Sequence, residues 1–580
     1  MENQVLKFNA LIEKVLSGLV PRKIACPQSE ISKYCEKEFE ITNEDINYLK
    51  RFKVPAPKLC PTCRRQRRYV FINQIDIFKR GCGAPGHSEK VISTIPSVSP
   101  YVTYDVDYYR NGGWDPILYG KDFDSLASFF SQFESLRRVV PHIAITSDPS
   151  NINSDYSVNG KNLKNGYRVT GGRNSENIWY TVVVFDSREI MDGFYVTKCE
   201  NCYEIVVSSN CYNSDFIYFS DGCVDCKFMY DCKNCTDCIG GVNLRNAKYV
   251  FWGEQLSKDE YGKRAKDFSI CSRKKLEEYK NKFWDMVKKS PVRGPRLLDA
   301  PGCTGVLTGS SKNCVESIGC FKSEDSRYCD MLTKTKDAMD ASASSGGEGF
   351  YQTISVGSDS SDMKFSVLAK NSSQCEFVIN CKNCTNCFAC VGLENKSYSI
   401  FNKQYEKEEY FKEIDKIKSQ MLEKGEYGEF LPTPLSCFAY NTSNAYDCFP
   451  LTQQEAKKLG SFWQLEEETD TAGSMVISVN DLPDDIKDVD GSILKNAIKC
   501  KVTGKLFRIV ATELEYLKKR NIALPTVHPK ERMLDRFAKI SSYRKNKDVC
   551  QKCGVSIESI YPNDAGWIVW CDDCYKKEFI

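Results

Sequence analysis

The sequence contains very little histidine: His87, His142 and His528 are the three histidines among 580 residues. A Ser–His or Cys–His relay would have to use one of them, and none lies in a recognisable catalytic motif. The chain also lacks a phosphate-binding loop, a dinucleotide fingerprint and an HExxH word. Catalysis therefore has little support, and no catalytic residue is assigned.

Long apolar runs and a strong charge imbalance are absent as well. No apolar run approaches the length that spans a bilayer, and residues 6–19 predict an amphipathic helix without a secretory cleavage pattern. The formal net charge of +3 leaves no global polyanion-binding signature, only local patches. We expect a cytoplasmic protein in a reducing environment, without membrane contact, or one packaged in a virion.

Cysteine, in contrast, is abundant, with 30 residues. Disulfides are disfavoured in a reducing compartment, so metal ligands and buried thiols are the two explanations. The sequence predicts that both occur.

The centre of the chain is a duplication. Residues 231–261 and 380–410 match at a constant shift of 149 positions. Short runs of Val, Ile, Phe and Tyr recur every 10 to 12 residues between Asn, Asp, Ser, Gly and Cys, which are strand and turn signals. A self-similar period favours a stacked solenoid over the alternative, a Greek-key sandwich. We predict a mainly β protein with helical insertions: a duplicated cysteine-rich, parallel β-helix-like solenoid flanked by zinc-ribbon-like α+β end modules.

The predicted domain order follows from these signals. An N-terminal helix and zinc-ribbon-like module (1–95) precedes an aromatic-rich α+β connector (96–173). The solenoid (174–451) carries helical inserts near 257–289 and 405–424. A linker (452–490) then leads to a C-terminal module (491–580) that holds a degenerate copy of the first module and a zinc ribbon.

The N-terminal module offers one metal site. A C-x-x-C knuckle and a more widely spaced pair give the four thiolates that a tetrahedral zinc requires: Cys26, Cys35, Cys60 and Cys63. Cys82 and His87 are rival ligands for the same site. Between the pairs, Thr42 and Asp45 predict the capped start of a short helix.

The C-terminal module repeats the first at a shift of 468 positions. Under this shift Cys60 meets His528 and Cys63 meets Glu531, and the other cysteine pair has no match, so this copy is expected to keep the fold without the metal. A second zinc site follows it. The C-x2-C-x17-C-x2-C spacing of a zinc ribbon is formed by Cys550, Cys553, Cys571 and Cys574.

One central run of cysteines is an alternative metal site, for zinc or an iron–sulfur cluster. Cysteines recur at every third residue in Cys381, Cys384, Cys387 and Cys390. A ferredoxin motif has a wider last gap and a following proline, and the first copy has Gly241 in the fourth place. A ladder of buried thiols is the favoured interpretation, and an iron–sulfur cluster is not expected.

Four arginines follow the first knuckle directly, in CPTCRRQRR: Arg64, Arg65, Arg67 and Arg68. A metal would hold the backbone there rigid, so these guanidinium groups could bind phosphates of nucleic acid. The alternative is that they cap helices or pair with the chain's many acids. The sequence leaves both interpretations open.

With VPAPKLCPTCRRQRR, KNCTDC, KNCTNC and the closing CQKC and CDDC pairs in view, the chain resembles a family of uncharacterised cysteine-rich zinc-ribbon and repeat proteins from small-genome bacteria and large DNA viruses. The resemblance implies the repeat fold and zinc binding. Some members carry a CaiB/BaiF-like CoA-transferase label, which no feature of this sequence supports. In the family the first pair is a tight knuckle, whereas here it is stretched between Cys26 and Cys35.

Taken together, these features predict a non-enzymatic zinc-binding scaffold with two zinc ions that engages nucleic acid or a ribonucleoprotein. A structural component of a virus particle or another large assembly, with protein partners, is the alternative. A metal-dependent or redox enzyme is third, and no small-molecule substrate is evident.

Overall fold

The computed structural model describes residues 7–465, 475–540 and 544–580, and groups the chain into two compact units. Unit 1 comprises Met1–Ile145, Pro295–Gln464 and Tyr543–Lys545; unit 2 comprises Thr146–Gly294, Leu465–Ser542 and Asn546–Ile580. The N-terminal segment therefore belongs with the second half of the centre, and the C-terminal segment with the first half. Range 174–451, predicted as one solenoid, is shared by both units. Residues 466–474 of the predicted linker lie outside the described residues.

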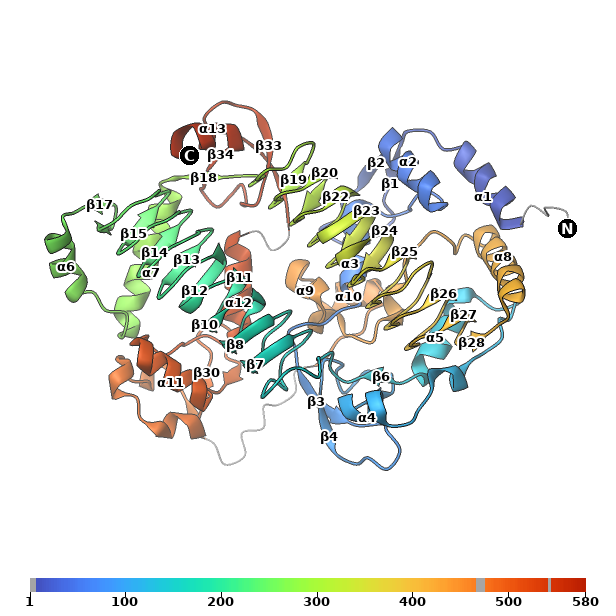
Figure 1. The fold of residues 1–580 in the computed structure, drawn as a ribbon, viewed down its shortest axis with the longest axis horizontal. Coiled ribbons are helices and arrows are strands. Elements are labelled where there is room, and N and C mark those ends of the chain that lie inside the picture. Colours follow the sequence, from blue (N-terminus) through green and yellow to red (C-terminus); the bar gives the residue numbers. More distant parts are fainter. Residues whose placement is uncertain (1–6, 466–474, 541–543) are drawn as a thin grey trace. The chain divides into compact units, whose positions relative to one another are not determined.

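Unit 2 contains an eleven-stranded sheet, called ladder 2 here (Figure 1). Its strands pair in parallel with a register of 12 residues, as in Lys161↔Arg173 and Arg188↔Glu200, and the last strand pairs antiparallel. The strands are β7 (Lys161–Tyr167), β8 (Arg173–Trp179), β9 (Val182–Phe185), β10 (Arg188–Met191), β11 (Phe194–Thr197), β12 (Glu200–Ser209), β13 (Asp215–Tyr218), β14 (Lys227–Tyr230), β15 (Ile239–Val242), β16 (Val250–Phe251) and β17 (Glu254–Gln255).

Unit 1 contains the matching ladder 1, in which sheets of two, five and three strands are joined by single parallel bridges. The register is again 12, but β24 and β25 pair with a register of 13, as in Glu348↔Ser361. The shift between the ladders is therefore 148 before this insertion and 149 after it. The strands are β19 (Gly305–Val306), β20 (Lys312–Val315), β21 (Ser317–Ile318), β22 (Glu324–Arg327), β23 (Thr333–Ser342), β24 (Ser345–Ile354), β25 (Ser361–Lys364), β26 (Thr385–Phe388), β27 (Ser397–Ile400) and β28 (Lys403–Gln404).

A three-residue unit underlies both ladders. Core residues recur at every third position, as with Cys235 and Cys238 in ladder 2. The residue before each has a positive φ: 53° at Asn234 and 52° at Asp237. Asn and Asp visit this left-handed region more readily than other non-glycine residues. The words KNCTDC and KNCTNC thus encode a turn residue followed by a core thiol.

Each unit also contains a small α+β module, called knuckle 1 in unit 1 and knuckle 2 in unit 2. In knuckle 1 the predicted capping box of Thr42 and Asp45 is confirmed, and the helix ends at Lys53, whose φ is 51°. Asn521 ends the matching helix of knuckle 2 with a φ of 50°, so the 468-residue repeat is confirmed as a repeated fold. Knuckle 1 consists of β1 (Arg22–Ala25), β2 (Glu38–Ile41), α2 (Asn43–Phe52) and α3 (Pro61–Tyr69); knuckle 2 consists of β30 (Ala497–Lys499), β31 (Leu506–Phe507), α11 (Ala511–Arg520) and α12 (Pro529–Ile540).

A hairpin, a short strand and a helix follow each knuckle, and we call these parts ribbon 1 and ribbon 2. In both, the short strand pairs in parallel with a strand that precedes a ladder in the chain. Ribbon 1 consists of β3 (Phe78–Gly81), β4 (Lys90–Ser93), β5 (Thr103–Tyr104), α4 (Val106–Asn111) and β6 (His142–Ile143); ribbon 2 consists of β32 (Asn546–Val549), β33 (Ser556–Ser559), β34 (Ile568–Trp570), α13 (Asp572–Phe579) and β18 (Pro291–Arg293).

The remaining helices pack on these parts, and the fold is mainly β with helices, as predicted. The expected N-terminal helix and both helical inserts are present, as α1, α6 with α7, and α8. Within the described ranges, no helix has the length and apolarity needed to cross a bilayer. The remaining elements are α1 (Lys7–Ser17), η1 (Pro116–Tyr119), α5 (Phe129–Val139), α6 (Lys258–Lys266), α7 (Arg273–Lys288), α8 (Lys407–Glu423), η2 (Thr433–Leu435), η3 (Tyr440–Thr442), α9 (Asn444–Cys448), α10 (Gln453–Lys458), β29 (Val476–Ile477), η4 (Val479–Asp481), η5 (Ile486–Asp488) and η6 (Gly491–Lys495).

Candidate metal centres

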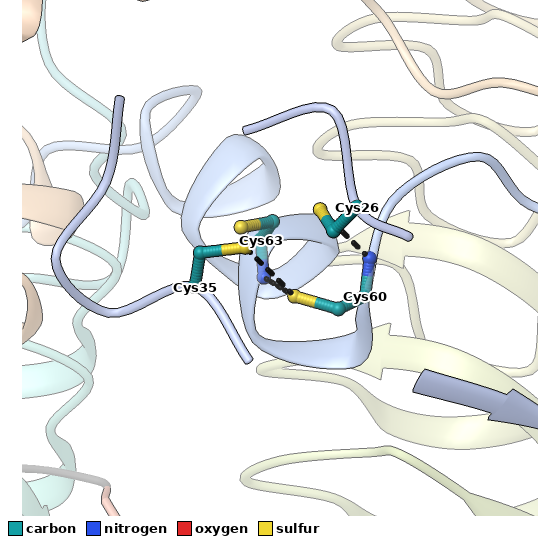
Figure 2. Close-up of side chains that lie close together, drawn as sticks. All are labelled: Cys26, Cys35, Cys60 and Cys63. Atoms are coloured by element: carbon teal, nitrogen blue, oxygen red, sulfur yellow. Dashed lines mark hydrogen bonds between the residues drawn. The ribbon is translucent and has the colours of Figure 1, made fainter. Parts of the chain in front are cut away.

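Four cysteines converge in knuckle 1 (Figure 2). Cys26 follows β1, Cys35 lies in the loop before β2, Cys60 is the N-cap of α3 and Cys63 lies in its first turn. Their four Sγ atoms lie within 4.8 Å of one another, and the Cys35 and Cys60 Sγ atoms are 3.9 Å apart. Sulfur ligands of a tetrahedral zinc are separated by about 3.8 Å, given Zn–S bonds of about 2.3 Å. The spacing is therefore compatible with a bound metal ion.

Backbone N–H groups point at these sulfur atoms. Lys37 N donates to Cys35 Sγ at 3.3 Å, and Cys60 N donates to Cys26 Sγ at 3.4 Å. The contact with Cys63 lowers the pKa of Cys60 to about 6. Such donors favour the thiolate, which is the form that binds metals.

The wide spacing of the first pair is explained by the hairpin. The N–H of Cys26 donates to the carbonyl of Lys37 at 2.6 Å, which closes the loop and brings Cys35 back to Cys26. The structure thus places all four predicted residues in one cluster.

The second four-cysteine cluster lies in ribbon 2. Cys550 follows β32, and Cys571 is the N-cap of α13, where its Sγ accepts from Cys574 N at 3.4 Å. The Cys553 and Cys571 Sγ atoms are 3.8 Å apart, and all four sulfur atoms lie within 4.8 Å. Burial opposes ionisation of Cys550, but backbone N–H groups near Cys571 and Cys553 lower its pKa to about 6. This cluster is also compatible with a metal ion.

Cys82 and His87, predicted as rival ligands of the first site, are not part of it. They lie in ribbon 1 and form a separate group with Asp105, whose ligand atoms also lie within 4.8 Å of one another. The carboxylate was not identified from the sequence, because acidic residues are too common to single one out.

Knuckle 2 has retained one cysteine that a fixed 468-residue shift does not find. Cys500 follows β30 as Cys26 follows β1, and its Sγ accepts from His528 N at 3.3 Å, just as Cys26 Sγ accepts from Cys60 N. The hairpin loop after Cys500 is shorter, since Cys500 N donates to Lys505 O. The prediction that this cysteine pair has no counterpart was wrong for one of its two members.

The four arginines of α3 do not lie on an open surface. Arg64 and Arg68 are 1% and 0% exposed. Arg64 Nε lies 2.8 Å and Arg68 Nη1 3.1 Å from the carboxylate of Asp340, which is itself buried in ladder 1. Arg67 pairs with Glu429 at 2.8 Å, and the Arg65 guanidinium lies 5.2 Å from the ring centre of a phenylalanine. The expectation that these side chains are free to contact phosphates is corrected: they attach knuckle 1 to its own unit.

Knuckle 2 repeats this attachment. Arg532 Nε and Arg536 Nη2 lie 2.9 and 3.2 Å from the two oxygens of Asp192, a buried residue of ladder 2. Asp192 and Asp340 both have a φ of 58°, so each carboxylate is presented from the same left-handed step of its ladder.

The central thiols form no metal group in the part of the chain that the structure describes. Residues three apart take successive steps around the repeat, so Cys381, Cys384, Cys387 and Cys390 do not converge on one point. Instead, Cys384 Sγ lies 3.3 and 3.4 Å from two carbonyl oxygens. Burial raises the pKa of such thiols, as at Cys329, so they remain protonated donors.

Neither the histidines nor the cavity forms a catalytic arrangement. His142 is buried, and burial lowers its pKa to about 3, so it stays neutral. Unit 2 has a cavity of about 1170 Å³ between knuckle 2 and ladder 2. Its charges are paired with one another, as in Lys501–Glu277 and Lys280–Glu204 at 2.9 and 2.7 Å.

No protein-family model and no curated protein matches the chain. Among solved structures, a candidate acetyltransferase from Desulfovibrio desulfuricans G20 is similar over 43% of this chain and 71% of its own, with 10% identity. The TM-score of this match is 0.10, so it carries no argument about fold or function.

Proposed function

We propose that the protein is a non-enzymatic zinc-binding scaffold with a zinc ion in each four-cysteine cluster. The observation that carries this proposal is the position of the clusters. Each joins a hairpin to the N-terminus of a helix, and all four ligands come from the protein. A zinc with four protein ligands has no open position for a substrate and serves a structural role.

The ladders supply the scaffold. We propose that each is a β-solenoid, in which the chain makes one coil per 12 residues and each coil packs on the next. The parallel register of 12, the left-handed residue at each third position and the stacked core thiols support this proposal. Stacked coils of this kind form rigid, extended surfaces.

The partner remains a separate question. Nucleic acid stays a prediction that retention at low salt would test, but Arg64 and Arg68 do not support it because they are buried ion-pair partners. An assembly role in a virus particle stays the alternative, which copurification with a particle in a fixed ratio would favour. Neither possibility depends on the zinc proposal.

Elemental analysis of the purified full-length chain tests the zinc proposal. Cys60→Ala and Cys550→Ala should each lose one equivalent of zinc relative to the unmodified protein. Cys437→Ala, a buried cysteine outside every cluster, is the matched control and should lose none. Unchanged zinc in the first two variants would contradict the proposal.

A further inference from the structure

The group in ribbon 1 has the spacing of a metal site. Asp105 Oδ2 lies 3.5 Å from Cys82 Sγ and 3.2 Å from His87 Nδ1. In a tetrahedral zinc site with ordinary bond lengths, sulfur and oxygen ligands are about 3.6 Å apart, and nitrogen and oxygen ligands about 3.3 Å. The three side chains are therefore placed as ligands without rearrangement.

Neighbouring groups fix the orientation of two of these side chains. Asp105 is the N-cap of α4, and its Oδ1 accepts the N–H groups of Asp107 and Tyr108, both at 2.9 Å. Its other oxygen, Oδ2, is thereby turned toward Cys82 and His87. The His87 ring packs edge-on against the Tyr108 ring at 5.0 Å. Supporting contacts of this kind orient the ligands of metal sites.

The His87 Nδ1 atom is an orphan. It is enclosed, and it makes no hydrogen bond of acceptable geometry to any residue in the described ranges. Yet two carboxylate oxygens, from Glu89 and Asp105, lie 2.8 and 3.2 Å away. An enclosed nitrogen between two anionic groups and a thiol requires either a proton or a cation to be satisfied.

Ribbon 2 supplies independent support, because its cluster occupies the same positions. Cys82 and Cys550 each follow the first strand of the hairpin, and each N–H donates to a carbonyl at the far end of the loop. Asp105 and Cys571 are both the N-cap of the following helix.

Counting from the end of the hairpin, a shift of 466 positions relates the rest of the two sites. It places His87 on Cys553, Asp105 on Cys571 and Tyr108 on Cys574. Three of the four ligand positions thus keep a ligand-type side chain, and only the fourth does not.

We propose that ribbon 1 holds a third metal centre, a zinc ion bound by Cys82 Sγ, His87 Nδ1 and Asp105 Oδ2, whose fourth position is open to a small exogenous ligand. Sulfur, imidazole and carboxylate ligands together suit zinc. With three protein ligands, of which His87 and Asp105 are 28% and 20% exposed, this ion exchanges faster than those in the four-cysteine clusters.

Cobalt substitution of the full-length protein tests the proposal. Co²⁺-loaded protein should hold three equivalents, and His87→Ala should hold two while keeping the charge-transfer bands of the four-thiolate sites. Azide should alter the visible spectrum of the unmodified protein and leave that of His87→Ala unchanged, because the four-thiolate sites have no open position. Asp107→Asn, which changes a nearby exposed carboxylate that faces away from the site, is the matched control and should behave as the unmodified protein.

The outcomes separate clearly. Two equivalents in the unmodified protein, or three in His87→Ala, would overturn the third centre. Three equivalents without a response to azide would overturn the open position. Circular dichroism of both variants, expected to match the unmodified protein, guards against loss of metal through unfolding, and a change confined to His87→Ala calls for Asp105→Asn as the second ligand variant, with the same expected loss.

Discussion

Knuckle 1 and knuckle 2 share a fold and an attachment but differ at the metal site. In both, two arginines of the second helix meet one buried aspartate of the ladder, Asp340 or Asp192. Knuckle 1 has four converging cysteines, whereas knuckle 2 keeps Cys500 alone among them. The attachment is therefore common to both modules, and the four-thiol cluster is not required for the fold.

The ribbons show the reverse distribution. Ribbon 2 has the four-cysteine cluster, and ribbon 1 has the mixed group of Cys82, His87 and Asp105. Each unit thus combines one four-thiol cluster with one altered copy, and the two units serve as internal controls for each other.

Metal removal should break this comparison most strongly. Cys60→Ala should unfold knuckle 1, because a structural zinc contributes about 10 kcal/mol to the folding of a small module. Hydrogen exchange should then rise in α2 and α3 while α11 and α12 stay protected. Cys500→Ala, the matched change in knuckle 2, should leave zinc content unaltered; equal effects of the two substitutions would refute the asymmetry.

Removing the aspartates should have the next largest effect, and an equal one in both units. Asp340→Ala and Asp192→Ala each leave two buried arginines without their partner, which costs about 3–5 kcal/mol in the free energy of unfolding. Denaturant unfolding measures this loss. Asp337→Ala, on the same strand β23, removes a surface pair with the half-exposed Arg51 and should cost under about 1 kcal/mol.

The pH dependence of knuckle 2 sharpens the comparison further. Burial raises the pKa of Glu513 from 4.5 to about 7. Below about pH 4.5 this carboxyl is protonated in both states, so its effect on stability is absent. Between pH 4.5 and 7 the unfolded state ionises first, so the free energy of unfolding should fall by up to roughly 3 kcal/mol and then level off.

Thermal unfolding across this pH range checks the effect. Glu513→Gln should remove the slope, whereas Glu515→Gln, an exposed position on the same helix α11, should retain it. A slope that survives in Glu513→Gln would assign it to another group.

The smallest effect is expected in the ladders. Cys384→Ala removes one sulfur atom from a packed interior and should cost about 1 kcal/mol. Metal content should not change, in contrast to Cys60→Ala. Loss of iron or zinc from Cys384→Ala would show that the central thiols bind a metal after all.

Several of these features could be predicted from the sequence, because they are local or repeated. The capping box at Thr42, the duplicated words and the tight cysteine pairs all lie within a few residues of one another. The 12-residue register was blurred, since strand centres drift along each coil and appear at intervals of 10 to 12.

Other features depend on residues far apart in the chain. Asp340 lies 276 positions from Arg64, and no local pattern marks it as the partner. Cys500 was missed because the hairpin loop of knuckle 2 is shorter, which defeats an alignment at a fixed shift.

The crossed order of the segments has a consequence for synthesis on the ribosome. Arg64 emerges 276 residues before Asp340, an interval on the order of tens of seconds at ordinary elongation rates. In unit 2 the order is reversed, and Asp192 precedes Arg536 by 344 residues. The nascent N-terminal module must therefore wait for its platform, and a site closed by residues 26–63 alone is complete throughout that wait. The C-terminal module meets a platform that has already been made.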